Sequence, residues 1–540
     1  MQNSTAIPCL ERFARIIVAG LNGGTGKTIL SLGLVRALSM GMYTQSPDAA
    51  HGHTMAIKPF KKGPDYIDAE WLGLAAGRSA TNLDPYFLTP DRIRTLFCHA
   101  MLTSMPRDLS CSEHDPKSCS PKGLNMGADM GIIEGNRGLF DGRDVTGTCS
   151  TAELARILKA PVILAMDCTK MTRTAAAIVA GMANFEKDVH IAGVVLNRTA
   201  NDRHRSMLRQ CIEHYTDVPV LGALPRLKVN PIPERHMGLV SDREFAECRD
   251  ELDAVARFIS DNVDVQRVIK IAESTVQGDI AQTTVQGDIA EVQDAAVESL
   301  WSNEIFGAVP SELSKISGDH APIIGYVRDA ALWFYYEENF EALRHAGATL
   351  VELSLLDDAP WPKLDGLYLG GGFPEVLAAE LETKRERLDA IRQLAHDGMP
   401  IYAECGGFMV LGDAIEMKGQ VHHMAGVFPT RTVFHPKPQG LGYVDAEVTA
   451  PNAFFPVGTI LRGHEFHYSQ VQAQENQSLE HALRLPKGTG MGKVSASTGS
   501  IGQDGLVFKN TFAAYTHLFA PAVPQWAPAF VKAAQKYAKQ

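Results

Sequence analysis

The sequence predicts an α/β protein with two doubly wound domains, each built on a parallel sheet covered by helices. Three observations support this fold class. Short apolar runs alternate with helically spaced apolar residues as far as about residue 245. A polar, partly repeated stretch follows, and a second alternating pattern begins at Pro322. A chain of 540 residues is also long enough for two or three domains of ordinary size.

The first predicted unit is a strand over residues 15–19, a glycine-rich turn and a helix over residues 29–38. Backbone N–H groups of such a turn bind phosphate, together with a lysine ammonium and a hydroxyl that binds Mg²⁺. The strict P-loop pattern needs glycine at position 21, where this chain has Leu21, so the loop is a variant. We predict nucleoside triphosphate binding here. The residues assigned to it are Gly23, Gly24, Thr25, Gly26, Lys27 and Thr28.

Four further strands are predicted in the first domain, and each ends in a polar residue. These end residues are Lys58, Glu134, Asp167 and Asn197. Because ligands of parallel sheets bind at the carboxyl ends of the strands, we expect all four to face the P-loop crevice. Asn197 is predicted to contact the adenine edge of the nucleotide, with an ordinary turn as the alternative.

The stretch that follows Lys58 combines three lysines with two aspartates. A solvated charge run is one reading, and a site for an anionic substrate with carboxylates for Mg²⁺ is the one we favour. The residues assigned to substrate are Lys61, Lys62, Asp65, Tyr66 and Asp68. Glu134 and Asp141 follow a strand where P-loop proteins carry an acidic Mg²⁺ partner, so we assign the metal to Thr28, Glu134 and Asp141.

Two stretches interrupt the alternating pattern. Residues 104–126 are predicted to be an irregular surface insertion, and its Cys111, His114 and Cys119 do not match the spacing of a zinc module. A nine-residue duplication within residues 275–290 is typical of a tolerated linker. We therefore predict a first domain over residues 1–258, a linker over 259–318 and a second domain over 319–540.

The second domain carries a cysteine between a predicted strand and a sharp glycine turn. Cys405 in this position resembles a nucleophile elbow, where the turn exposes the sulfur and the helix N-terminus stabilises a thiolate. An earlier glycine turn could donate N–H groups to an oxyanion, so Gly372 and Gly406 are the predicted donors. His517, near the chain end, is the predicted base. This order resembles a class I glutamine amidotransferase with a flavodoxin-like sheet.

The motifs together resemble the cobyrinic acid a,c-diamide synthase family. The matching stretches are residues 62–68, 134–135, 141–142, 233–236, 370–375, 404–407 and 462–469. The resemblance implies ATP- and glutamine-dependent amidation of the a and c side-chain carboxylates of cobyrinic acid in cobalamin biosynthesis, with Mg²⁺ as cofactor. It also explains Leu21, since the family's P-loop is shifted.

The resemblance implies a mechanism with two sites. Cys405 forms a glutamyl thioester and releases ammonia, with His517 as proton carrier. Phe519 replaces the glutamate that most class I amidotransferases carry two residues after this histidine, which implies a Cys–His dyad. At the first domain a substrate carboxylate becomes an acyl phosphate, and ammonia reaches it through a closed interface or tunnel.

Two rival classes of function remain open. One is amidation of a related macrocycle, by cobyric acid synthase or by a,c-diamidation of hydrogenobyrinic acid or nickel sirohydrochlorin. The other is a non-enzymatic P-loop switch. Such a switch needs a signature lysine where this chain has Asn22, and such switches carry no amidotransferase domain.

Composition narrows the partners and the compartment. A formal charge of −11 argues against non-specific nucleic-acid binding. Nine cysteines without a compact pairing pattern are typical of reduced thiols. Residues 1–5 lack the signature of a signal peptide, and no stretch reaches the length of a membrane span. We expect a cytoplasmic enzyme of small molecules, with a homodimer as its assembly.

Overall fold

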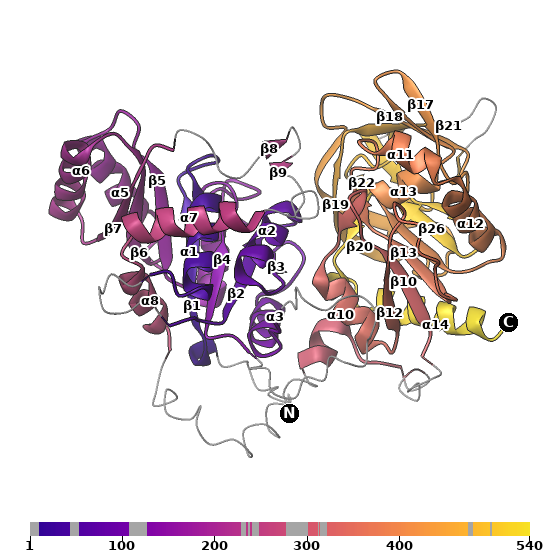
Figure 1. Ribbon diagram of the computed structural model, residues 1–540, viewed down its shortest axis with the longest axis horizontal. Helices are drawn as coiled ribbons and strands as arrows, with labels where there is room; N and C mark the ends of the chain where they lie inside the picture. Colours follow the sequence, from indigo (N-terminus) through magenta and orange to yellow (C-terminus); the bar gives the residue numbers. More distant parts are fainter. Residues whose placement is uncertain are drawn as a thin grey trace, which may run out of the picture. The chain divides into compact units, whose positions relative to one another are not determined.

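The computed structural model describes residues 10–43, 53–106, 127–227, 234–235, 238–239, 248–276, 301–310, 313, 321–473, 479–496 and 499–540. The chain forms two compact units, Met1–Trp301 and Ser302–Gln540 (Figure 1). Cys111, His114 and Cys119 lie outside the described residues, as does most of the duplicated segment.

The first unit contains seven parallel strands in the order β3-β2-β4-β1-β5-β6-β7. Their bounds are Ala14–Gly20 (β1), Ile57–Lys62 (β2), Thr81–Leu83 (β3), Met130–Glu134 (β4), Val162–Asp167 (β5), Ile191–Thr199 (β6) and Val220–Pro225 (β7). Every residue of β1, β2 and β4 is buried, as expected for parallel strands covered on both faces. The predicted doubly wound fold of this domain is confirmed, and β1 lies at the centre of the sheet.

Helices cover both faces of this sheet. They are α1 (Lys27–Ser39), α2 (Ile67–Ala76), α3 (Pro90–Leu102), α4 (Thr151–Leu158), α5 (Arg173–Phe185), α6 (Asp202–Tyr215), α7 (Cys248–Asn262) and α8 (Val265–Glu273). Helices α1, α2, α7 and α8 share one core with Ile16 and Val18 of β1, and α7 lies beside α1 (Figure 1). Phe97 of α3 stacks on Phe60 of β2 with ring centroids 4.9 Å apart. Outside the sheet are a 3-10 turn, Leu10–Arg12, and a strand pair, β8 (Glu234–Arg235) and β9 (Gly238–Leu239).

The predicted linker begins too early. Residues 259–276 complete α7 and form α8, whose Val265, Val268 and Ile269 are buried in the core of the first unit. The polar composition of this stretch concealed an amphipathic helix, because its few apolar residues all lie on one face.

Strand β2 also differs from the sequence prediction, which ended it at Lys58. The strand continues to Lys62, because β4 pairs with it as far as Lys61 and β3 as far as Lys62. Lys58 is therefore the second residue of the strand, opposite Gly131, and its ammonium donates to the Ser79 carbonyl oxygen at 2.8 Å. It does not lie at the carboxyl end of the sheet.

The second unit is built on a six-stranded sheet in the order β12-β10-β13-β15-β26-β25. The strands are β10 (Ile323–Val327), β12 (Thr349–Leu353), β13 (Gly366–Leu369), β15 (Ile401–Glu404), β25 (Leu506–Phe508) and β26 (Thr511–Ala514). All neighbours are parallel except β25 with β26. The helices are α10 (Glu337–His345), α11 (Ala378–Thr383), α12 (Arg385–His396), α13 (Gly406–Leu411) and α14 (Trp526–Ala538), with a 3-10 turn at Ala520–Ala522.

Two further sheets, one mixed and one antiparallel, complete the second unit, and the sequence analysis did not predict them. A four-stranded sheet contains β16 (Ala414–Met417), β17 (Gln420–His423), β18 (Thr430–Phe434) and β21 (Ser469–Ala473). A six-stranded sheet contains β19 (Gly440–Val448), β20 (Ile460–His467), β22 (Leu483–Lys487), β23 (Gly492–Ala496), β24 (Gly499–Asp504) and β27 (His517–Leu518). The short strands β11 (Leu332–Phe334) and β14 (Gly371–Gly372) pair beside the central sheet.

Candidate active site

The glycine-rich turn connects the carboxyl end of β1 to the first residue of α1. Gly24 and Gly26 have φ angles of +76° and +93°, which side chains other than glycine rarely adopt. A Cβ atom on Gly26 would lie 2.2 Å from the Asn197 amide nitrogen. The turn is therefore tightly packed, and the free N–H groups of the first turn of α1 lie beside it.

Lys27 and Thr28 lie at this end of the sheet. The Lys27 side chain is buried, and its ammonium donates to the Asn22 carbonyl oxygen at 3.1 Å. Burial lowers the pKa of Lys27, and the charge of Glu134 opposes that shift. The Thr28 hydroxyl donates to Glu134 Oε1 at 2.9 Å. The structure thus brings the predicted phosphate-binding and metal-binding side chains together.

Glu134 is the last residue of β4 and lies opposite Val18 of β1. Its Oε1 also accepts from the Lys61 ammonium at 3.0 Å. Its Oε2 is buried and has no hydrogen-bond partner among the described residues. Burial raises the pKa of Glu134, and the Lys61 charge opposes that shift. A buried carboxylate oxygen without a partner is unfavourable and marks a position where a ligand can bind.

Lys61 is the centre of an ion cluster. Its ammonium contacts a carboxylate oxygen of Asp68, lies 3.7 Å from Asp65 Oδ2 and contacts Glu134. Burial alone would lower the pKa of Lys61, but the three carboxylates outweigh it and raise the pKa well above its usual value. Burial and the Asp68 charge raise the pKa of Asp65 to about 7.

The structure excludes the solvated charge run that was one reading of the three lysines. Lys58, Lys61 and Lys62 are all buried, and the exposed fraction of Lys61 is 2%. The strand that carries them is covered on both faces, which removes their side chains from bulk water. Lys61 in particular is neutralised within the protein, so it has no free charge with which to attract a polyanion.

The loop from Glu134 to Asp141 lies on the P-loop backbone. The Gly135 N–H donates to the Val18 carbonyl oxygen at 2.8 Å, and the Leu139 N–H donates to that of Gly20 at 2.8 Å. Asp141 is exposed, accepts from the Gly138 N–H at 2.9 Å and raises the pKa of Lys27 through its charge. Asp141 is therefore close enough to act on the nucleotide site.

Asn197 and Tyr66 lie at the same edge of the sheet. The Asn197 amide donates to the Thr25 carbonyl oxygen at 2.8 Å and accepts from the Arg198 N–H at 2.8 Å. These contacts fix Asn197 against the P-loop, and its contact with adenine stays a prediction. Tyr66 is half-buried and immediately precedes α2.

In the second unit, Cys405 lies between β15 and α13. Its φ of +47° and ψ of −101° are strained for a side-chain-bearing residue. The Cys405 N–H donates to the Ala514 carbonyl oxygen at 2.7 Å, and the sulfur lies 3.7 Å from the Phe466 carbonyl oxygen. This is the geometry of the predicted nucleophile elbow, in which the strained turn holds the sulfur at the helix N-terminus.

Gly372 and Gly406 lie next to one another. A Cβ atom on Gly406 would lie 2.9 Å from the Gly372 nitrogen. Gly372 has a φ of +157°, and a Cβ there would lie 2.1 Å from the Ala331 carbonyl oxygen. Both positions therefore need glycine, and their backbones approach one another closely, while their role as oxyanion donors stays a prediction.

His517 lies three residues after β26, the strand that pairs with β15. A Cβ atom on Gly371 would lie 2.5 Å from His517 Cε1, so the imidazole packs against the predicted oxyanion turn. The ring of His464 stacks on the His517 ring with centroids 4.8 Å apart. His517 therefore lies at the same edge of the sheet as Cys405, and its role as the base stays a prediction.

Sequence reasoning missed a carboxylate beside this histidine. Glu404 Oε2 lies 3.8 Å from His517 Nδ1 and accepts from the Tyr368 hydroxyl at 3.1 Å, and Oε1 accepts from the Leu518 N–H at 2.9 Å. Glu404 has no exposed surface. The only signal in the sequence was an acidic residue immediately before the nucleophile.

The thiol of Cys405 is strongly perturbed. Burial raises its pKa well above the usual value, and the charge of Glu375 raises it further, while the Gly406 N–H lowers it. In the free protein Cys405 is therefore a thiol at neutral pH, contrary to the thiolate that the elbow alone suggested.

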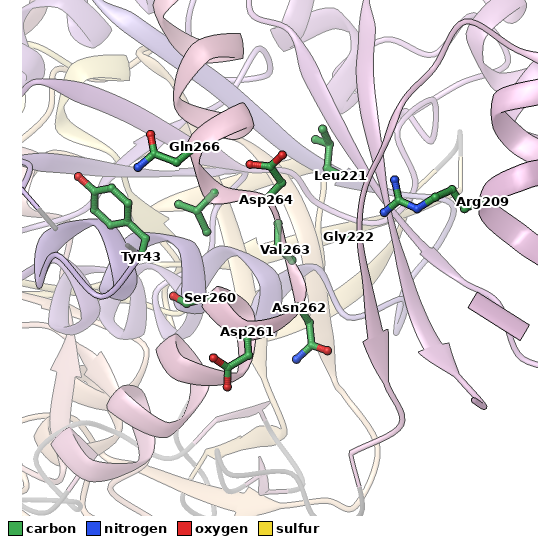
Figure 2. Close-up of a pocket in the computed structure, with 11 residues that line it drawn as sticks. Tyr43, Arg209, Leu221, Gly222, Ser260, Asp261, Asn262, Val263, Asp264 and Gln266 are labelled. Atoms are coloured by element: carbon green, nitrogen blue, oxygen red, sulfur yellow. The ribbon is translucent and has the colours of Figure 1, made fainter. Parts of the chain in front are cut away.

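A separate cavity of about 560 Å³ lies in the first unit, and no P-loop residue is among those that line it (Figure 2). It is lined by the turn between α7 and α8, the start of β7, Tyr43 and Arg209. The Asp264 carboxylate caps α8 by accepting from the Arg267 N–H at 3.0 Å. None of the predicted site residues lines it.

Two family models match the chain. Residues 16–240 match the CobQ/CobB/MinD/ParA nucleotide binding domain, and residues 323–523 match the CobB/CobQ-like glutamine amidotransferase domain. These ranges contain the P-loop site and the cysteine site respectively.

Curated relatives match almost the whole chain. A cobyrinate a,c-diamide synthase of Magnetococcus marinus is 36% identical over 519 residues, which cover 96% of each chain. Relatives of the same name from Listeria monocytogenes and Methanothermobacter thermautotrophicus are 33% and 32% identical, over 93% and 97% of this chain and 96% and 100% of theirs.

A solved structure described as PurLQS from Thermotoga maritima covers 40% of this chain and 99% of its own at 17% identity. Its TM-score of 0.29 carries no argument about the fold. In the part of the chain that the structure describes, no helix combines the length and the apolar character that a membrane span requires.

Proposed function

The chain belongs to the cobyrinate a,c-diamide synthase family of glutamine-dependent amidating ligases, and from this premise we propose that it amidates the a and c side-chain carboxylates of cobyrinic acid. The observation that carries the proposal is that one chain contains both of the side-chain clusters that this reaction would need. The first unit holds a P-loop with Thr28 bonded to Glu134, and the second holds Cys405 in a strained elbow beside the turn that packs on His517.

The second unit supplies ammonia. Cys405 Sγ attacks the side-chain carbonyl carbon of glutamine, and its proton passes through His517 to the leaving nitrogen. The carbon–nitrogen bond breaks, ammonia leaves, and water later hydrolyses the thioester to glutamate. The N–H groups of Gly372 and Gly406 would stabilise the oxyanion in both steps. Glu404 would hold the His517 ring in position from the side of Nδ1.

The first unit activates the macrocycle. A carboxylate oxygen attacks the γ-phosphorus of ATP, ADP leaves, and an acyl phosphate forms. Ammonia then attacks the acyl carbon, and phosphate leaves. Lys27 would neutralise charge that develops on the β- and γ-phosphates, because its ammonium can exchange the Asn22 carbonyl for phosphate oxygens.

The residues present fit Mg²⁺ bound with the nucleotide. Magnesium in such sites uses one or two protein oxygens and keeps waters and phosphate oxygens as its other ligands. The Thr28 hydroxyl and the partnerless Oε2 of Glu134 offer these oxygens, and Asp141 is near enough to orient a water. When bound, the ion would offset the negative charge of the triphosphate.

The acidic cluster would orient the reacting carboxylate. Asp65 and Asp68 are held by Lys61 at the end of β2, and Asp65 Oδ1 accepts from the Asp68 N–H at 2.9 Å at the start of α2. We propose that Tyr66 and Lys62, which belong to the same stretch, contact the macrocycle. Lys61 would act through the carboxylates that it holds.

Mass spectrometry of products tests the proposal. The protein is incubated with ATP, Mg²⁺, glutamine and cobyrinic acid, and formation of the a,c-diamide with two ADP per product supports it. Conversion of hydrogenobyrinic acid or nickel sirohydrochlorin alone would assign a related macrocycle, and amidation at other side chains would assign cobyric acid synthesis. Lys27→Ala should produce no macrocycle-dependent ADP, which links the reaction to the P-loop.

A further inference from the structure

Glu375 is a buried acidic residue in the amidotransferase unit for which the mechanism above has no use. Glu375 follows β14, in a turn that packs against the nucleophile elbow. The turn approaches the elbow at Pro374, whose Cδ would lie 3.0 Å from a Cβ atom on Gly406. The exposed fraction of Glu375 is 7%. Its Oε2 has no hydrogen-bond partner among the described residues. A buried carboxylate oxygen without a hydrogen-bond partner is unfavourable in the free protein, and a ligand that donates a hydrogen bond to it would remove that cost.

The charge of Glu375 acts directly on Cys405. After burial, it is the strongest influence on the thiol, and burial raises the pKa of Glu375 itself to about 7. Among the described residues, the other titratable groups around Cys405 are carboxylates, a phenol and imidazoles. They are Glu404 and Asp504, which raise the pKa of the thiol, and Tyr515, His464 and His517 on the strands packed beside it. The strongest charges that act on the thiol are thus those of three carboxylates, Glu375, Glu404 and Asp504.

We propose that Glu375 binds the α-ammonium group of the glutamine that Cys405 attacks, and that this pairing switches the thiol on. The inference rests on the proposed glutaminase reaction and names how its substrate is recognised. Glutamine carries an α-ammonium group. This group can donate a hydrogen bond to the partnerless Oε2 of Glu375 and offset the negative charge of its carboxylate.

Substrate binding and activation would then be coupled. Without glutamine, the carboxylate of Glu375 opposes formation of a second negative charge on the sulfur. With the ammonium bound, that opposition is cancelled, and the thiol proton can pass to His517 as Sγ attacks the amide carbon. The same residue thus keeps the nucleophile unreactive until glutamine arrives.

A substrate that lacks only the α-ammonium tests recognition. Glutaminase activity of the full chain is measured with glutamine and with 4-carbamoylbutanoate, for wild type and Glu375→Gln. A charge-assisted hydrogen bond contributes about 1.5–3 kcal/mol, so wild type should prefer glutamine by roughly 10- to 100-fold in kcat/KM. In Glu375→Gln the ratio of kcat/KM for glutamine to kcat/KM for 4-carbamoylbutanoate should fall towards one. Glu380→Gln, the same change at an exposed position of α11, should keep it.

Two further readouts do not depend on the variant's turnover. The wild-type preference for glutamine should increase from pH 6 to pH 8, because Glu375 loses its proton near pH 7 and only then pairs with the ammonium. In the free protein at pH 7.5, iodoacetamide should alkylate Cys405 several-fold faster in Glu375→Gln than in wild type, with the site followed by peptide mass spectrometry. A merely structural role would move neither quantity in these directions.

The outcomes separate this inference from the proposed function. If wild type hydrolyses no glutamine, the glutaminase reading itself is wrong. If wild type hydrolyses glutamine and 4-carbamoylbutanoate equally well, or if Glu375→Gln keeps the full preference while slowing both substrates alike, Glu375 is not the ammonium site. Slower alkylation in Glu375→Gln would overturn the switch.

Discussion

Lys61 shows how burial decides what a charged residue does. In the sequence it belongs to a run of lysines, and in the structure it is enclosed with carboxylates of Asp65, Asp68 and Glu134. A buried ammonium in this setting balances charge and positions its partners. Its effect on the macrocycle is then exerted through the carboxylates.

Replacement of Lys61 by methionine tests this role. Lys61→Met leaves buried carboxylates without their cation, so we expect a loss of about 3–5 kcal/mol of stability and a large fall in kcat for macrocycle-dependent ATP hydrolysis. Thermal unfolding and ADP release measure the two effects. A stable variant with normal kcat and only a raised KM for the macrocycle would show that Lys61 binds substrate directly.

Glu404 supplies a carboxylate beside His517 that comes from the strand before the nucleophile. General acid–base catalysis contributes about 10²–10⁴-fold, so misorientation of His517 in Glu404→Gln should lower kcat of the glutaminase by at least about 10-fold, with KM for glutamine nearly unchanged. Steady-state kinetics measures both constants, with Glu380→Gln as the surface control. Unchanged kcat would leave Cys405 and His517 as a dyad.

Glu375 also makes stability depend on pH. Its pKa rises from about 4.5 in the unfolded chain to about 7 in the folded protein, so the folded protein binds its proton more tightly. Its contribution is present below pH 4.5 and is lost as the pH rises through 7, by at most about 3 kcal/mol. Glu375→Gln should therefore gain stability relative to wild type at pH 8 compared with pH 5, as chemical denaturation measures. A difference that does not change with pH would contradict the raised pKa.

At the scale of elements, strand register positions the ligase site. Lys61 pairs with Glu134 across β2 and β4, and Val18 pairs with Glu134 across β1 and β4. One carboxylate is thereby placed between the P-loop and the acidic stretch. Because β2 runs four residues beyond Lys58, it delivers Lys61 and Lys62 to the functional edge of the sheet.

Helix α8 belongs to the core of the first unit, which a core truncation can test. Val268 is fully buried, so Val268→Ala should destabilise that unit by about 2 kcal/mol, whereas the exposed Lys270→Ala should have little effect. Calorimetry of the whole chain can identify the relevant transition, because ATP·Mg²⁺ should raise it. If the first unit unfolded at the same temperature in both variants, residues 265–273 would belong to the linker and not to the core of the first unit.

Each unit of the molecule has its own sheet, its own core and its own candidate site. We therefore expect Cys405→Ala to lose glutamine-dependent amidation and to keep amidation with high concentrations of ammonium, because the first unit still activates the carboxylate. Diamide formation with each nitrogen donor is the measurement. If the folded variant lost both activities, the two sites would not be separable.

Features that depend on neighbouring residues could be predicted from the sequence. The turn before Lys27 and the elbow at Cys405 are local, since a few consecutive residues define the backbone conformation and the chemistry together. Both parallel sheets were also predictable, because buried parallel strands are short continuous apolar runs. The mixed and antiparallel sheets of the second unit were not, since strands such as β19 and β20 are half-exposed and carry a weaker pattern.

Which charged side chains are buried, and which groups they contact, could be seen only in the folded chain. Glu134 meets Lys61 across 73 positions of the sequence, and Glu404 meets His517 across two strands of the second unit. Glu375 lies in the glycine-turn stretch 370–375. Only the folded chain shows that its Oε2 is buried without a hydrogen-bond partner among the described residues. Electrostatic free energy depends on distance and burial in space, and a linear pattern specifies neither.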